Sequence, residues 1–196
     1  MTKYSIYARK CTIEVLDLKE KNIFFDKYHI QGHDLSQIRL GLKYKNRLVA
    51  IMTFCKLRKS MGRKSVEGSY ELSRYATVAN FNVIGGAGKL FKYFKNNYIN
   101  DLKKIISYTD LRWNTGKLYE NIGFKLVKEN TGVCYFYIHQ DYNNYLKRFN
   151  RFNFRKNILN EKLKIFDKNK TEFENMDING YLRIYDCGCK LFELNI

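Results

Sequence analysis

The sequence contains no proline, and only 12 of its 196 residues are glycine. Its longest apolar run, residues 48–55, has the length of a strand, whereas a membrane-spanning helix needs about 20 apolar residues. The first residues lack the apolar block of a secretory signal peptide. These absences predict a soluble protein of the cytoplasm.

Cysteine use argues against two further classes of protein. The five cysteines are odd in number and follow no disulfide-framework spacing. Cys187 and Cys189 are separated by one residue and have no histidine nearby, so they do not form a usual zinc pair. Cys11, Cys55 and Cys134 lie in apolar runs, which predicts ordinary core thiols. We therefore expect neither a disulfide scaffold nor a metal site.

Acidic residues are scarce. The chain has 19 Asp and Glu against 36 Lys and Arg, a formal net charge of +17. The abundance of Lys, Asn, Ile, Tyr and Phe is typical of a genome rich in A and T, but such a bias would supply acidic residues as well. A surplus this large favours a polyanionic partner. We expect nucleic acid, either DNA or RNA.

Predicted strands and helices alternate along the first 140 residues. The strands are expected at residues 11–16, 37–44, 48–55, 69–76, 104–109, 124–127 and 133–138, and the helices at 19–28, 88–98 and 115–121. The second and third strands form a hairpin across Lys45-Asn46-Arg47. Because most of the strands are sequential neighbours, the pattern is typical of an α/β or α+β fold.

After residue 140 the composition changes to interleaved aromatic and basic residues. The pattern predicts two helices and a hairpin there, over residues 156–163, 171–176 and 181–194. Thr171 and Glu174 have the spacing of a capping box. We interpret residues 1–140 as the core domain and residues 141–196 as a basic, aromatic-rich C-terminal extension that packs on it.

A glycine-rich segment joins the strand at 69–76 to the next helix. Glycines at such a junction let backbone N–H groups approach a pyrophosphate, and the helix N-terminus adds a favourable dipole. The segment predicts a phosphate-binding loop made of Asn82, Val83, Ile84, Gly85, Gly86, Ala87, Gly88, Lys89 and Leu90. A purely structural turn is the alternative.

Two motifs together resemble the GNAT (Gcn-five-related N-acetyltransferase) superfamily. Asn82-x-x-Gly85-x-Ala87 resembles its Gln/Arg-x-x-Gly-x-Gly/Ala loop, with Asn in the first position. Leu118-Tyr119-Glu120-Asn121-Ile122-Gly123-Phe124 resembles its Leu-Tyr-Glu-Lys-Leu-Gly-Phe segment, although the preceding stretch, residues 114–117, is shorter than usual. The likeness covers roughly residues 10–140. It implies the GNAT fold, a mixed and mainly antiparallel splayed sheet flanked by helices.

The resemblance also implies a chemistry. GNAT enzymes use acetyl-CoA or a related acyl-CoA, whose pyrophosphate accepts hydrogen bonds from the loop amides. Tyr119 matches the tyrosine that protonates the departing thiolate, and Glu71 is the candidate general base. Alternation along the strand places Glu71 and Arg74 on opposite faces, so only a bulge would bring them into one cleft. Structural roles, as a buried aromatic and as the partner of an arginine, are the alternatives for Tyr119 and Glu71.

Other segments are similar to a phage-associated group of GNAT-like proteins that includes Mom-type DNA-modification proteins. These segments are residues 29–32, 70–74, 107–113 and 183–188. Mom-type proteins modify adenine in DNA, so this likeness implies base modification in a phage-infected or prophage-carrying bacterial cell, with double-stranded DNA as the partner. The residues predicted to contact the substrate are His29, Gln31, Arg74, Tyr108, Arg112 and Trp113.

Several of these residues have a predicted role in the site, and for some of them a purely structural role is the alternative. Asp110 and Arg112 end a strand and would stand at the mouth of a splayed sheet, with Asp110 as a third candidate catalytic residue. Trp113 could stack on an extruded base, or it could simply belong to the core. His29 and Gln31 could hydrogen-bond a base edge, although a satisfied histidine at a helix C-terminus is the alternative for His29.

The basic residues after residue 140 recur at intervals of three or four. Arg148, Arg151, Arg155 and Lys156 would share one face of a helix and suit phosphate contacts, with Lys59 and Arg63 as a second contact. The interleaved Phe149, Phe152 and Phe154 are expected to anchor the segment. A merely solvated charged surface is the alternative.

The function that these features favour is an acyltransferase of GNAT fold that modifies a base in nucleic acid. A noncatalytic DNA-binding module of the same fold is one alternative. Another is an N-acetyltransferase for a small molecule, tRNA or protein. A nuclease is not expected, because the three histidines form no His-Asn-His-like cluster and no acidic metal pair is evident.

Overall fold

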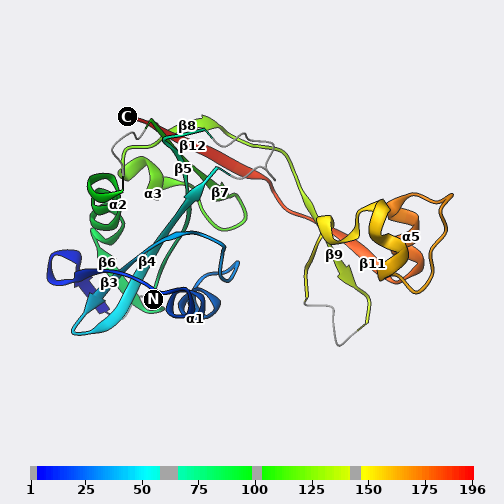
Figure 1. The fold of residues 1–196 in the computed structure, drawn as a ribbon, viewed down its shortest axis with the longest axis horizontal. Coiled ribbons are helices and arrows are strands. Elements are labelled where there is room, and N and C mark those ends of the chain that lie inside the picture. The colour runs from blue at the N-terminus through cyan, green and yellow to red at the C-terminus, as the bar shows by residue number, and fades with distance from the viewer. Residues whose placement is uncertain (1–3, 58–65, 99–102, 142–146) are drawn as a thin grey trace. The chain divides into compact units, whose positions relative to one another are not determined.

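The computed structural model describes residues 4–57, 66–98, 103–141 and 147–196. The chain divides into two compact units (Figure 1). Unit 1 comprises residues 1–109, 114–129 and 190–196, and unit 2 comprises residues 110–113 and 130–189. Among the described residues, no helix combines the length and apolar character that crossing a membrane requires.

The central sheet has seven strands in the order β2-β3-β4-β5-β7-β12-β8. Their bounds are β2 Thr12–Val15, β3 Ile38–Tyr44, β4 Arg47–Lys56, β5 Ser69–Thr77, β7 Lys104–Asp110, β12 Cys189–Asn195 and β8 Lys125–Lys128. The pairing is antiparallel from β2 to β5 and between β12 and β8, whereas β5 and β7 are parallel. The predicted α+β class with a mainly antiparallel sheet flanked by helices is confirmed.

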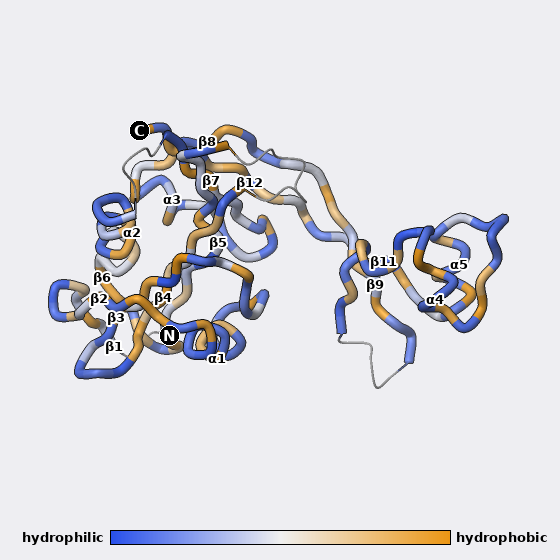
Figure 2. Tube along the Cα trace, viewed as in Figure 1, coloured by the Kyte–Doolittle hydropathy of each residue, from blue (hydrophilic) through white to orange (hydrophobic). Residues whose placement is uncertain are grey.

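Three helices accompany this sheet in unit 1: α1 Leu18–Tyr28, α2 Gly86–Asn97 and α3 Lys117–Asn121. Alternation along β4 serves both faces, because Phe54 packs with α2 while Ile51 packs with α1. The rings of Phe54 and Phe94 stack at 3.6 Å, and both are fully buried. Figure 2 shows β4 as largely hydrophobic, as a strand covered on both faces must be.

Most elements of unit 1 lie where the sequence predicts them. The hairpin between β3 and β4 turns at Lys45 and Asn46, which both have positive φ, at 48° and 60°, as a tight hairpin turn requires. One pair of strands was not predicted: β1 Tyr4–Tyr7 and β6 Phe81–Ile84 form a parallel two-stranded sheet. Each has only four residues, so neither is long enough to show a clear alternation.

Unit 2 is built around β9 Tyr135–His139, which pairs with β10 Phe149–Asn150 and β11 Tyr181–Tyr185. Its helices are α4 Leu159–Lys162 and α5 Glu172–Ile178, with 3-10 turns at Arg151–Phe154 and Lys156–Ile158. Tyr137 is fully buried at the centre, among Phe154, Leu159, Leu163 and Met176. The capping box of Thr171 and Glu174 is confirmed at the start of α5.

Two predictions for the C-terminal region are wrong. The segments 181–186 and 190–194 do not form a hairpin, because β11 pairs with β9 while β12 pairs with β8. The helix expected at 156–163 is a 3-10 turn followed by the short α4.

The units also do not coincide with the predicted boundary at residue 140. Unit 2 takes in residues 110–113 as well as 130–189, and residues 190–196 return to unit 1, where Leu191 and Phe192 are buried. The apolar character of this last strand accounts for its place in the large sheet. That the extension packs on the core stays a prediction.

Gly116 gives a test of the unit 1 core. It has φ 91°, and a Cβ there would overlap the Phe192 ring, whereas Gly123 has φ 96° and a Cβ there would meet only Leu194, at 3.9 Å. We expect Gly116→Ala to lower the free energy of unfolding by about 2 kcal/mol more than Gly123→Ala, because only the first adds overpacking to backbone strain. Urea denaturation of both variants measures this difference, and equal losses would contradict it.

Candidate active site

The glycine loop is held between a strand and a helix. β6 pairs with β1 in the register Ser5↔Asn82 to Tyr7↔Ile84, and Gly85 follows at φ 74°, a conformation that favours glycine. The Lys89 N–H donates to the Gly85 carbonyl at 3.0 Å and closes the first turn of α2. The N–H groups of Gly86, Ala87 and Gly88 therefore precede the helical ladder and form the anion-binding end of the helix.

Gly86 is required for a different reason. A Cβ at this position would lie 2.9 Å from both the Tyr75 hydroxyl oxygen and a Val83 methyl carbon. The β5 residue Tyr75 thus reaches the start of α2. Burial raises the pKa of Tyr75 to about 12, so its hydroxyl keeps its proton at neutral pH.

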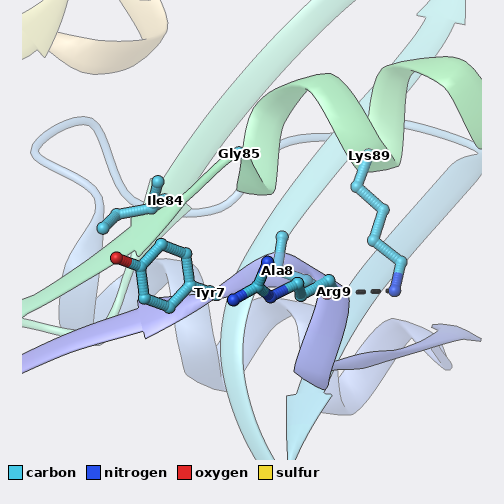
Figure 3. Close-up of a pocket in the computed structure, with 6 residues that line it drawn as sticks. All are labelled: Tyr7, Ala8, Arg9, Ile84, Gly85 and Lys89. Atoms are coloured by element: carbon cyan, nitrogen blue, oxygen red, sulfur yellow. Dashed lines mark hydrogen bonds between the residues drawn. The ribbon is translucent and has the colours of Figure 1, made fainter.

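A cavity of about 400 Å³ lies beside the loop (Figure 3). It is lined by Tyr7, Ala8, Arg9, Ile84, Gly85 and Lys89. The Lys89 ammonium group donates hydrogen bonds to the carbonyl oxygens of Ala8, at 3.0 Å, and Cys11. Lys89 therefore fastens the 3-10 turn Ala8–Lys10 to α2 and keeps a positive charge beside the cavity.

Arg9 is a residue of this cavity that sequence reasoning missed. Its guanidinium group lies 4.9 Å from the centre of the Tyr7 ring, and the residue is exposed. A planar cation beside the N-terminus of a helix suits a phosphate. The only sequence signal for this role was the basic pair Arg9 and Lys10, which follows β1 and lies far before the glycine loop in the sequence.

β5 and β7 are paired over a short distance only. The register covers Ser69↔Lys104, Tyr70↔Ile105 and Glu71↔Ile106, although the strands continue to Thr77 and Asp110. After the last pair, the Ser107 hydroxyl donates to the Leu72 carbonyl at 2.8 Å. Among the described residues of these two strands no further ladder pair joins them, so the sheet splays beyond Glu71 and Ile106.

Tyr119 lies at this point of parting. Its hydroxyl donates to the carbonyl oxygen of Tyr108 at 3.5 Å, two residues past Ile106. The Tyr119 ring is held between Phe124 and Phe192, with centroid distances of 5.8 and 5.3 Å. The predicted proton donor and the predicted contact Tyr108 are thus brought together beside the splay.

A bulge changes the direction of the side chains along β5. Thr53 pairs with Arg74 and Phe54 pairs with Leu72, so Ser73 is the extra residue. Leu72 packs in the core beside α2, which places the buried Glu71 on the α1 face. Beyond the bulge Arg74 also reaches that face, where it donates to the Gln31 side chain at 2.6 Å. The bulge that sequence reasoning required for Glu71 and Arg74 is present.

His29, Gln31 and Arg74 form one group on the α1 face. The His29 Nδ1 accepts a hydrogen bond from the Gln31 N–H at 3.2 Å, and the imidazole ring packs against Phe25. Burial and the nearby Arg74 charge lower the pKa of His29 to about 4, although Asp34 acts in the opposite direction. His29 is therefore neutral at pH 7 and can accept a hydrogen bond.

A buried polar network, which sequence reasoning missed, supports this group. Lys21 and Asp34 form an ion pair with Nζ–Oδ1 at 3.1 Å, and the Lys21 side chain is fully buried. Burial raises the pKa of Asp34, but hydrogen bonds from Ser36, Ser73, Lys21 and Thr53 outweigh it and lower the pKa to about 2. The network ties the loop after α1 to β4 and β5. The network could not be predicted from the sequence, because Lys21 has the sequence context of an exposed helix lysine.

Asp110, Arg112 and Trp113 belong to unit 2. The Arg112 guanidinium group contacts both carboxylate oxygens of Asp110, at 2.9 and 2.5 Å, so this carboxylate is part of an ion pair. That hydrogen bonding raises the pKa of Arg112. Trp113 is 52% exposed, so the alternative that it belongs to the core is wrong. Its stacking on a base stays a prediction.

Only some of the predicted nucleic-acid contacts lie among the residues that the structure describes. Arg148, Arg151, Arg155 and Lys156 are all exposed, but they do not share a helix. Arg148 precedes β10, Arg151 begins the first 3-10 turn, Arg155 lies between the two turns and Lys156 begins the second, so the single-face argument is wrong. Phe149 and Phe154 pack in the unit 2 core as expected, whereas Phe152 is 48% exposed. Lys59 and Arg63 lie outside the described residues.

The cysteine predictions have mixed outcomes. Cys11 and Cys55 are buried thiols, as expected, but Cys134 is exposed. Burial is the main cause that raises the pKa of Cys189 to about 11. Within the part of the chain that the structure describes, no group of three or more His, Cys, Asp or Glu side chains is arranged to hold a metal ion.

Comparison with known proteins identifies the fold. No family model and no curated protein matches the sequence. Among solved structures, the chain is similar to the ribosomal-protein-S18-alanine N-acetyltransferase from Escherichia coli, with a TM-score of 0.50, 10% identity and coverage of 95% of this chain and 94% of that one. This chain has the GNAT fold.

The chain is also similar to two further solved structures. One is smu.2055 from Streptococcus mutans UA159, with a TM-score of 0.50, 12% identity and coverage of 94% and 98% of the two chains. The other is a GNAT family acetyltransferase from Elizabethkingia anophelis with acetyl-CoA bound, with a TM-score of 0.48, 16% identity and coverage of 95% and 99%. The likeness to Mom-type proteins is not among these findings and stays a prediction.

His29 gives a pH test of the α1 face. A histidine whose pKa falls from 6.5 to about 4 on folding favours the unfolded state when it is protonated, so stability is present above pH 6.5 and is lost as the pH falls toward 4. Between pH 6.5 and pH 4, protonation of His29 should lower the wild-type free energy of unfolding by about 2 kcal/mol, and this decrease should be absent in His29→Gln. Urea denaturation from pH 7 to pH 4 measures it.

The exposed His33 provides the matched control. His33→Gln also removes a histidine, but one that pairs with the exposed Asp26 and lies outside the group of His29, Gln31 and Arg74, so the loss assigned to His29 should persist. A wild-type pH dependence retained in His29→Gln would contradict the assignment.

Proposed function

We propose that this protein is an acyl-CoA-dependent N-acyltransferase that modifies an amino group of a base in nucleic acid. One observation carries the proposal: β5 and β7 part after three pairs, and the Tyr119 hydroxyl lies where they part. Strands that part expose backbone N–H and C=O groups, which an extended acyl thioester chain can satisfy. The GNAT fold supports the same reaction class.

The donor side of the site fits an acyl-CoA. The first turn of α2 offers the N–H groups of Gly86, Ala87 and Gly88, and Arg9 lines the cavity next to Gly85. Both features suit a pyrophosphate. When bound, the donor would supply a thioester, whose carbonyl carbon is open to attack by an amine.

Side chains of this protein would then transfer two protons, one to the leaving sulfur and one from the attacking amine. The nitrogen–carbon bond forms as the carbon–sulfur bond breaks, and the Tyr119 hydroxyl gives its proton to the departing sulfur. The attacking amine loses a proton, and Glu71 is the carboxylate on the α1 face that accepts it. Such proton transfers contribute about 10²-fold to 10⁴-fold in rate. The rings of Phe124 and Phe192 hold Tyr119 in place for this step.

The acceptor class is supported by charge and by the α1 face. The formal charge of +17 favours a polyanionic substrate. The neutral His29, the Gln31 amide and the Arg74 guanidinium are groups that hydrogen-bond base edges. Adenine, which the resemblance to Mom-type proteins implies, is the first base to test.

Removal of the Tyr119 hydroxyl tests the chemistry. We expect Tyr119→Phe to lower the rate of acyl transfer at least about 100-fold, because the ring packing is kept while the proton donor is lost. Nucleosides from DNA of cells that express the wild type should carry a new adduct by mass spectrometry, and the adduct should be absent with Tyr119→Phe. Tyr93→Phe, at a partly buried position on α2, is the matched control and should keep the adduct.

Different results would correct different parts of the proposal. Unchanged nucleosides together with acylation of a small amine by the purified protein would overturn the acceptor class and leave the donor chemistry standing. If Tyr119→Phe kept both base modification and acylation of a small amine, Tyr119 would not be the proton donor. An absence of acyl transfer to any amine would favour a noncatalytic binding module.

Arg9 tests the donor site. We expect Arg9→Gln to weaken acetyl-CoA binding about tenfold, because it removes a charged hydrogen bond to phosphate, whereas Arg47→Gln at the start of β4 should bind as the wild type does. Isothermal titration calorimetry with acetyl-CoA measures both. Equal affinities for the two variants would exclude Arg9 from the site.

A further inference from the structure

Arginine and aromatic side chains alternate along one surface of unit 2. Arg155 lies 5.1 Å from the Phe152 ring centre, and Arg151 contacts both Phe152 and Tyr135, at 5.6 and 5.0 Å. Arg183 continues the series, since it lies 4.5 Å from Tyr135 and 4.5 Å from Phe173. We call this series of three arginines and three rings the arginine ladder: Arg155, Phe152, Arg151, Tyr135, Arg183 and Phe173.

The ladder joins segments that are distant in the sequence, and hydrogen bonds to a buried residue hold one end of it. Arg183 donates from Nε and one terminal nitrogen to the Tyr137 hydroxyl, both at 3.2 Å, and Tyr137 is fully buried. Glu172 accepts hydrogen bonds from the hydroxyls of Tyr137, at 2.8 Å, and Tyr135, at 3.2 Å. Glu172, which adjoins Phe173 in the sequence, is thus engaged with tyrosines. The guanidinium groups are held in place, so little side-chain entropy is lost when they bind a ligand.

The end of the ladder at Arg151 and Arg155 is basic and accessible. Arg151 and Arg155 are exposed, and the rings of Phe152 and Phe173 are 48% and 45% exposed. No Asp or Glu occurs between residues 142 and 160. A stacked guanidinium group keeps its N–H edge for hydrogen bonds while its face lies on the ring, and this edge matches two phosphate oxygens. A row of such groups suits a ligand with regularly repeated phosphates.

The rings argue against a base-stacking role. Tyr135 and Phe152 each contact two guanidinium groups, so a base that stacked on either ring would compete with bound cations. Single-stranded nucleic acid is bound largely through such stacking, whereas duplex DNA is held through its phosphates. We propose that the arginine ladder binds the phosphate backbone of duplex DNA without reading its sequence.

Direct binding measurements test the ladder. Fluorescence anisotropy with a labelled 20-base-pair DNA at about 100 mM salt should show that Arg151→Gln/Arg155→Gln binds at least about tenfold more weakly than the wild type. Its slope of log affinity against log salt should fall by about two, since two phosphate contacts are lost. Lys164→Gln/Lys168→Gln removes two exposed charges of the same unit and should change affinity less than about threefold.

A charge-preserving variant separates geometry from charge. Arg151→Lys/Arg155→Lys keeps the net charge but loses the planar fork, so it should bind about threefold or more weaker than the wild type. Equal losses in the ladder and control pairs would overturn the proposal, as would wild-type binding by the lysine variant. Tighter binding of the single strand than of the duplex would overturn the assigned partner, and so would equal competition by polyglutamate.

The test is independent of the proposed catalytic function. It uses the full chain without an acyl donor, and Tyr119→Phe should bind the duplex as the wild type does, because Tyr119 lies in unit 1. A wild-type protein that binds the duplex but transfers no acyl group would therefore fault the catalytic proposal alone. Intact acyl transfer with no duplex binding would fault the ladder alone.

Discussion

The site depends on the separation of two parallel strands that begin as neighbours. An open sheet leaves backbone polar groups without ladder partners, and each such buried group costs free energy unless another group satisfies it. Side chains take over part of this work here: the Ser107 hydroxyl donates to the Leu72 carbonyl, and the Tyr119 hydroxyl donates to that of Tyr108. The predicted catalytic hydroxyl thus also contributes to the local structure of the splay, which is why its removal has to be judged beside a stability measurement.

The two faces of the splayed strand are fixed by different means. On the α2 face, Leu72 and Tyr75 pack in the apolar core, and Tyr75 reaches the close turn at Gly86. On the α1 face, Asp34 accepts hydrogen bonds from both β4 and β5 and pairs with the buried Lys21. A buried ion pair with these extra hydrogen bonds adds little net stability, but loss of one partner is costly, about 3–5 kcal/mol. The network fixes the loop after α1 to the sheet, and His29 and Gln31 lie in the same loop.

The sequence predicted what depends on local patterns and on motifs. Alternation and periodicity located α1, α2 and the β3–β4 hairpin, and the glycine loop and the tyrosine segment indicated the fold that the structure shows. Long-range partners were not predictable. Neither the pairing of β12 with β8 nor the approach of Arg9 to Gly85 leaves a trace in spacing, because both join residues distant along the chain. The bulge at Ser73 was posed only as a condition, since a single extra residue in a strand has no sequence signature.

Charge is distributed unequally between the units, and this separates two roles. Unit 1 has 25 Lys and Arg against 11 Asp and Glu, whereas unit 2 has 11 against 8. Net charge acts over the Debye length of about 8–10 Å and raises association rates, so the surplus on unit 1 favours the encounter with a polyanion. Unit 2 has little surplus to offer. If it binds a phosphate backbone, it does so because ring contacts hold Arg151 and Arg183 in place, and affinity there should follow geometry more than charge.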